Sequence, residues 1–207
     1  GSEMCIRDSV IRELGCDAIL VATPPYNKPS QVGIIEHFKA IHAACGLPLV
    51  AYNVPGRSGV AITAATMGAL SQQGIITSIK EASGSIDTLA DMMVAVRDDC
   101  QVLSGDDSLF LATLAYGGRG IISVVANAFP EEMVALYNAF ECGDAAEARR
   151  LQLGLLPRMR TAFVEANPVP IKAALARMGV IESDAVRLPL TPLSLTNLDR
   201  VYKEYVG

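Results

Sequence analysis

The feature that most constrains the fold of this chain is a regular alternation of short apolar runs with longer segments of helical period. The runs begin at residues 19, 48, 75, 101 and 120, so that successive starts are 29, 27, 26 and 19 residues apart. This spacing is close to the length of one βα unit. The runs are apolar on both faces, which is typical of buried parallel strands. The predicted strands are 19–23, 48–53, 75–80, 101–104 and 120–125.

Helical segments separate these strands and continue alone after the last one. Apolar stripes at helical spacing include Ile34, Phe38, Ile41 and Cys45. The residues in N-cap positions are Ser30, Thr63, Ser85 and Asp107. After the fifth strand the sequence predicts helices over 131–142, from 145 with an interruption near Pro157, over 169–178 and over 195–205. We expect an α/β chain with a β/α region at 10–142 and a helical region at 143–207.

Composition excludes several classes of protein. Hydrophobic residues make up 51% of the chain and charged residues 19%, which excludes disorder and fibrous repeats. The net charge is −5 and no basic tract is present, so a nucleic-acid partner is not expected. No apolar run approaches the ~20 residues that cross a bilayer, so a membrane partner is not expected either. The start of the chain has no features of a signal peptide.

Metal and redox sites have no support in the sequence. Five cysteines lie at wide spacings without a C-x-x-C pair, and a reducing cytoplasm is their natural compartment. His37 and His42 are five residues apart, so they do not share a helix face as a pair of metal ligands would. The glycine-rich stretch 117–120 lacks the spacing of a phosphate-binding loop and favours a turn.

Chemistry-bearing residues follow the predicted strands. Parallel β/α proteins place their active sites at the carboxyl ends of the strands. Tyr26 follows the first strand, Tyr52 and Arg57 follow the second, and Lys80 ends the third. We expect these four side chains to converge on one rim. The neighbouring pair Asp106-Asp107 precedes a helix, and N-capping explains at least one of the two carboxylates.

Each candidate also has a purely structural interpretation. Lys80 in an apolar barrel would lose its proton easily and attack a ketone, but it could also extend to the surface or pair with Glu81. Tyr52 and Tyr26 could transfer protons or fill the core. Arg57 could bind a carboxylate with two hydrogen bonds or lie in a solvated loop. The residue pattern alone favours the structural interpretation of Lys80.

Six segments together favour the catalytic interpretation. They read TPPYNKPSQ at 23–31, YNVPGRSG at 52–59, IKEASG at 79–84, LSGDD at 103–107, GIISV at 120–124 and NPVPIK at 167–172. In this order they resemble the dihydrodipicolinate synthase family, within the pyruvate-dependent class I aldolases. The resemblance extends from about residue 10 to the end of the chain.

The resemblance implies a catalytic role for three residues. Lys80 would form a Schiff base with pyruvate, and Tyr52 would transfer protons during imine formation and the later cyclisation. Tyr26 would complete the proton relay by reaching into the site of a neighbouring subunit. The covalent adduct on Lys80 means that no metal or organic cofactor is expected.

The resemblance also implies a substrate-binding set. Arg57 would hold the carboxylate of aspartate semialdehyde, while Gly105 and the main-chain carbonyl of Ile122 would line the pocket beside the lysine. An arginine at the position of Arg57 favours the synthase. An aldolase related to N-acetylneuraminate lyase or acting on keto-sugar acids is the alternative activity.

The architecture implied is a partial (β/α)8 barrel, made of strands four to eight of the family, followed by a helical region. Counterparts of the first three strands, of a Gly-Thr-Thr-Gly-Glu motif and of most of the lysine feedback site are not found in the sequence. Open strand edges invite pairing with another chain, so we expect a homo-oligomer. A non-catalytic fragment that folds and self-associates is the third possibility.

Overall fold

The computed structural model describes residues 14–207 of this chain. The start of the predicted β/α region, at 10–13, lies outside the described residues. The chain divides into two compact units, and the boundary in the sequence falls between Ile122 and Ser123. This division precedes the boundary after Cys142 that the sequence suggests, because α7 (Pro130–Glu141) packs along α8 (Ala145–Thr161) in the second unit.

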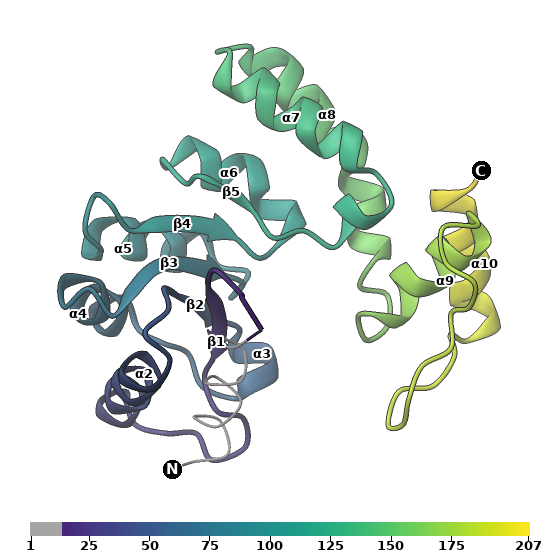
Figure 1. Ribbon diagram of the computed structural model, residues 1–207. Helices are drawn as coiled ribbons and strands as arrows, with labels where there is room; N and C mark the ends of the chain where they lie inside the picture. Colours follow the sequence, from purple (N-terminus) through teal and green to yellow (C-terminus); the bar gives the residue numbers. More distant parts are fainter. Residues whose placement is uncertain (1–13) are drawn as a thin grey trace. The chain divides into compact units, whose positions relative to one another are not determined.

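The first unit contains one parallel sheet (Figure 1). Its strands are β1 (Ile19–Ala22), β2 (Leu49–Asn53), β3 (Ile76–Glu81), β4 (Gln101–Ser104) and β5 (Gly120–Ile121). They are hydrogen-bonded in chain order, β1-β2-β3-β4-β5, with every pair parallel. All five predicted strands are confirmed. The last is shorter than the predicted 120–125, because the chain turns into the 3₁₀ helix η2 (Val125–Asn127).

Helices follow each of the first four strands. They are α2 (Gln31–Cys45), α3 (Pro55–Ser58), α4 (Ala64–Gln72), α5 (Ile86–Ala95), η1 (Asp107–Leu109) and α6 (Phe110–Ala115). Ser30, Thr63 and Ser85 cap α2, α4 and α5 through their side-chain oxygens, as predicted. The prediction for Asp107 is wrong, because the preceding Asp106 accepts the hydrogen bond from the amide of Ser108, at 2.9 Å, and caps η1.

The two faces of the sheet differ in burial. One face packs against α2, α4 and α5, and its core includes Val21, Leu49, Ala51, Ile79 and Val102. The opposite face is partly exposed in the part of the chain that the structure describes. It includes Leu20 (47% exposed), Val50, Tyr52, Lys80 and Leu103. The apolar runs predict that both faces of the sheet are buried. In the described part of the chain only the helix-covered face is buried.

The second unit is helical, as predicted. After α7 and α8 it contains α9 (Val169–Arg177) and α10 (Leu195–Tyr205), which share a core with Ile171, Val201 and Tyr205. The predicted interruption at Pro157 is wrong. Helix α8 continues through this exposed proline, which lacks one backbone hydrogen-bond donor. The helix is held on either side of the proline by the buried side chains of Leu155 and Met159. No helix among residues 14–207 is long and apolar enough to cross a membrane.

Candidate active site

Lys80 and Tyr52 form the centre of the candidate site. They are register partners near the carboxyl ends of β3 and β2, so their side chains leave the sheet on the same face. The ammonium nitrogen Nζ of Lys80 lies 4.4 Å from the centroid of the Tyr52 ring. In the protonated state of Lys80, this cation–π contact holds the ammonium against the aromatic face.

Burial changes the ionisation of both groups. Desolvation lowers the pKa of Lys80, the nearby Asp107 carboxylate partly offsets this by raising it, and the Arg57 guanidinium lowers it further. Desolvation raises the pKa of Tyr52, against a smaller opposite effect of Arg57. Both shifts favour the uncharged forms. The arrangement therefore raises the fraction of neutral amine, which is the nucleophilic form of lysine, beside a phenol that can donate a proton.

Gly105 leaves the space that Lys80 occupies. A Cβ atom at this position would lie 3.0 Å from both Cγ and Cε of Lys80 and 2.7 Å from Cβ of Ala82. The amide of Gly105 donates to the carbonyl of Glu81 at 2.6 Å, so its backbone is tied to the end of β3. Any larger residue here must push the lysine or the strand end aside.

Arg57 belongs to the short helix α3 directly after β2. The turn is closed by the Ser58 hydroxyl, which donates to the carbonyls of Val54 at 3.2 Å and Val60 at 2.8 Å, and by Gly59, whose φ is +78°. The positive charge of Arg57 influences the pKa of both Tyr52 and Lys80. The structure therefore brings Arg57, Tyr52 and Lys80 into one electrostatic group.

The other two sequence-predicted positions lie at the same end of the sheet. The amide of Ile122, just after β5, donates to the carbonyl of Ser104 at 2.9 Å, and the residue is 38% exposed. Tyr26 follows β1 with a left-handed φ of +73° and is 93% exposed, so its ring packs against almost nothing among residues 14–207. The structure does not join Tyr26 to the Lys80 group.

An ion pair between Lys80 and Glu81 is excluded by the direction of the two side chains. Successive side chains of a strand point to opposite faces. Glu81 is 6% exposed on the helix-covered face, where its carboxylate accepts hydrogen bonds from Asn53 and from the amide of Ser83. The carboxylate that acts on Lys80 is instead that of Asp107, which is 2% exposed.

Sequence reasoning missed the functional interest of Asn53, Glu81 and Asp107. The period-two alternation of a strand could have placed Asn53 and Glu81 behind Tyr52 and Lys80. Asp107 had no such signal, since either of two adjacent aspartates can cap a helix.

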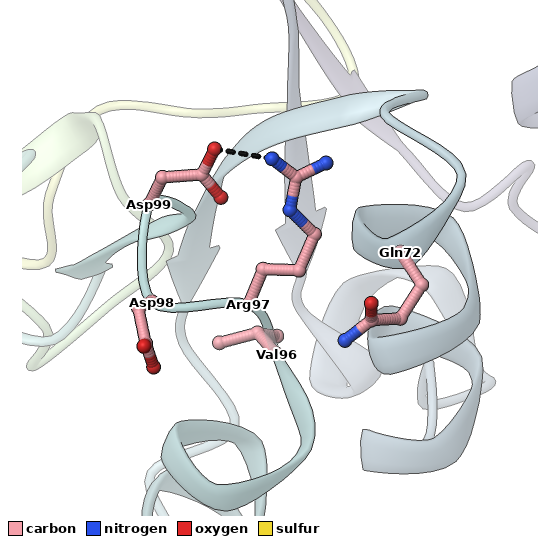
Figure 2. Close-up of a pocket in the computed structure, with 5 residues that line it drawn as sticks. All are labelled: Gln72, Val96, Arg97, Asp98 and Asp99. Atoms are coloured by element: carbon pink, nitrogen blue, oxygen red, sulfur yellow. Dashed lines mark hydrogen bonds and ion pairs between the residues drawn. The ribbon is translucent and has the colours of Figure 1, made fainter.

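A pocket of about 440 Å³ lies elsewhere in the first unit (Figure 2). It is lined by Gln72, Val96, Arg97, Asp98 and Asp99, before the amino end of β4. Its Arg97 is already held by the carboxylate of Asp99 and by the backbone carbonyl of Ser71. It is separate from the strand ends that carry Lys80. Within residues 14–207 no group of three or more His, Cys, Asp or Glu side chains could hold a metal ion.

Comparisons with known proteins identify the family of this chain. The model of the dihydrodipicolinate synthetase family matches residues 8–205. The 4-hydroxy-tetrahydrodipicolinate synthase of Citrifermentans bemidjiense is 47% identical over 197 residues, which cover 94% of this chain and 68% of that protein.

Solved structures give the same assignment. The dihydrodipicolinate synthase of Thermotoga maritima superposes with a TM-score of 0.93 at 38% identity, covering 97% of this chain and 70% of that one. The chloride-inhibited dihydrodipicolinate synthase of Acinetobacter baumannii, solved in complex with pyruvate, gives a TM-score of 0.90 at 36% identity, with the same coverage. This chain therefore belongs to the dihydrodipicolinate synthetase family, whose members are lyases of the class I aldolase type.

Proposed function

We propose that this chain condenses pyruvate with aspartate semialdehyde through a Schiff base on Lys80, as a 4-hydroxy-tetrahydrodipicolinate synthase of lysine and diaminopimelate biosynthesis. The observation that carries the proposal is the half-buried Lys80 amine, 4.4 Å from the Tyr52 ring centroid, with its pKa lowered by desolvation. A lysine in this state is the nucleophile that imine formation requires.

The first half of the reaction makes the imine. The neutral Nζ of Lys80 attacks the ketone carbon of pyruvate, and the resulting carbinolamine loses water. The phenol of Tyr52 donates the proton that the leaving oxygen needs, which its neutral state allows. The gap left by Gly105 accommodates the lysine chain, and the main-chain carbonyl of Ile122 lines the pocket.

The second half joins the two substrates. Loss of a methyl proton converts the imine to an enamine, whose carbon attacks the aldehyde and forms the new C–C bond. Arg57 binds the carboxylate of aspartate semialdehyde and orients it. The substrate's amino group then attacks the imine carbon, closes the ring and releases the amine of Lys80. No metal or organic cofactor takes part in this scheme.

We further propose that β1–β5 are strands four to eight of an eight-stranded barrel, with the partly exposed face of the sheet as its interior. The alignment with structures of which this chain covers 70% supports this. We propose a homo-oligomer, in which the exposed Tyr26 completes the proton relay of a neighbouring subunit. The cytoplasm stays the predicted compartment.

Borohydride trapping tests the proposal. The chain is reduced in the presence of pyruvate and analysed by intact mass and peptide mapping, with Lys80→Ala and the exposed-lysine control Lys39→Ala in parallel. One reduced pyruvate unit on Lys80, lost only in Lys80→Ala, is expected. A folded sample that takes no label refutes the Schiff-base proposal. Faster release of pyruvate from N-acetylneuraminate than condensation with aspartate semialdehyde refutes the synthase assignment.

A further inference from the structure

A buried amide–carboxylate pair lies directly behind the Lys80–Tyr52 pair. Asn53 and Glu81 are the last residues of β2 and β3 and are register partners, as are Tyr52 and Lys80 one residue earlier. Because side chains alternate along a strand, Asn53 and Glu81 project to the helix-covered face. Their exposed fractions are 0% and 6%.

The hydrogen bonds of this pair are directional. Nδ2 of Asn53 donates to Oε2 of Glu81 at 2.7 Å, and the amide of Ser83 donates to Oε1 of Glu81 at 2.6 Å. Oδ1 of Asn53 accepts from the amide of Ile62 at 3.0 Å. Each Glu81 oxygen therefore has a donor, and Asn53 uses both ends of its amide. A buried carboxylate without these donors would be strongly destabilised.

These bonds connect three segments that carry the site. They join the end of β2 to the end of β3, fix the turn after β3 through Ser83, and tie the far end of the Arg57 loop back to the sheet through Ile62. Two backbone hydrogen bonds extend the connection. The amide of Ala82 donates to the carbonyl of Asn53 at 2.9 Å, and the amide of Gly105 donates to the carbonyl of Glu81 at 2.6 Å.

We propose that Asn53 and Glu81 are positioning residues, whose hydrogen-bonded pair sets the relative placement of Lys80, Tyr52 and Arg57 from behind the sheet. The inference rests on the proposed Schiff-base function. Neither residue touches substrate, since both project away from the face that carries Lys80. Catalytic geometry is sensitive to displacements of about 1 Å, so a loosened pair should slow imine formation.

The direction of the hydrogen bonds provides a sharp test. Glu81→Gln replaces one carboxylate oxygen with an NH2 group, which must face either Nδ2 of Asn53 or the amide of Ser83, so two donors face each other. Turning the Asn53 amide only moves this conflict to the amide of Ile62. Asn53→Asp places two carboxylates face to face. The double variant Asn53→Asp/Glu81→Gln restores every bond, because the new aspartate accepts from Ile62 and from the new glutamine, which still accepts from Ser83. It also keeps the net charge of the parent.

The matched control is Ser71→Ala. Ser71 is another buried polar residue of the first unit, with its hydroxyl donating to the carbonyl of Gly68 at 3.1 Å and accepting from the amide of Arg97 at 3.2 Å. It belongs to α4, and its partner Arg97 lines the pocket of Figure 2. Its loss is expected to lower the melting temperature without slowing the trapping of pyruvate.

The experiment measures the initial rate of borohydride trapping with saturating pyruvate, together with the melting temperature, for the parent, both single variants, the double variant and Ser71→Ala. The single variants are expected to trap at least about 10-fold more slowly, and the double variant within about threefold of the parent. A single variant that does not fold leaves the decision to the double variant, whose bonds are complete.

Two results would overturn the positioning role while leaving the proposed function intact. One is folded single variants that trap at the parental rate. The other is a folded double variant that stays as slow as the single ones, since the carboxylate itself would then be needed at position 81. A parent chain that does not trap pyruvate refutes the proposed function, and the positioning role with it.

Discussion

Replacing Gly105 with alanine should displace the lysine of the candidate site. The new Cβ would lie 3.0 Å from Cγ and Cε of Lys80 and 2.7 Å from Cβ of Ala82. Carbon atoms normally approach to about 3.5–4.0 Å, so the overlap with the lysine is about 0.5–1 Å. The Lys80 side chain can move, whereas the Ala82 Cβ is fixed to the backbone. Overpacking of this kind costs about 1–3 kcal/mol of folding free energy.

A shift of this size at the nucleophile should slow pyruvate trapping by about 10- to 100-fold. The assay follows the borohydride-reduced adduct by intact mass over time, and urea denaturation gives the change in stability. Gly154→Ala is the matched control, because nothing lies within 4 Å of the corresponding Cβ in α8. It is expected to trap at the parental rate and to be no less stable. Parental stability and trapping rate in Gly105→Ala would refute the steric argument.

Three further predictions concern ionisation and local structure. Burial lowers the pKa of Lys80, and the neutral amine is the form that reacts. The rate of trapping should therefore rise with pH and reach half its maximum below 10.5, the ordinary pKa of lysine. A midpoint at or above 10.5 would contradict this. Gln31→Ala removes four hydrogen bonds to residues 61–66 and should cost about 1–3 kcal/mol in urea denaturation, against little change in the exposed Gln73→Ala. Ser30→Ala removes the α2 cap and should cost about 1 kcal/mol by the same measurement; no loss would refute the capping assignment.

The lowered pKa of Lys80 also predicts how the stability of the fold changes with pH. A lowered pKa means that the unfolded chain binds more protons at Lys80 than the folded chain does between the lowered value and 10.5. Stability from this group therefore rises with pH across that window. The measurement is the melting temperature of the parent minus that of Lys80→Met at several pH values, and a difference that falls with rising pH would contradict the sign.

The strands and helices were predictable because their apolar periods differ. The run that contains Ile79 and the stripe of Ile34, Phe38 and Ile41 are local patterns, and tertiary packing reinforces both. The rim position of Lys80, Tyr52 and Arg57 followed from a rule of topology, that parallel strands share a carboxyl edge.

What could not be predicted depends on contacts distant in sequence or on choices between equivalent residues. Composition cannot tell which face of β1 or β2 is covered, so the exposure of Leu20 was not foreseen. The cap at Asp106 rather than Asp107 depends on the residue at which η1 begins, which two adjacent aspartates do not reveal. The bond between Asn53 and Glu81 joins residues 28 positions apart, and only the register of β2 and β3 brings them together.

The central claim is that Lys80 is a desolvated amine that forms an imine with pyruvate. The most direct test is a peptide map of the chain after borohydride reduction with pyruvate. The predicted result is a single labelled peptide containing Lys80, absent in Lys80→Ala and unchanged in Lys39→Ala. A folded chain without label, or one labelled on exposed lysines regardless of Lys80, would contradict the claim.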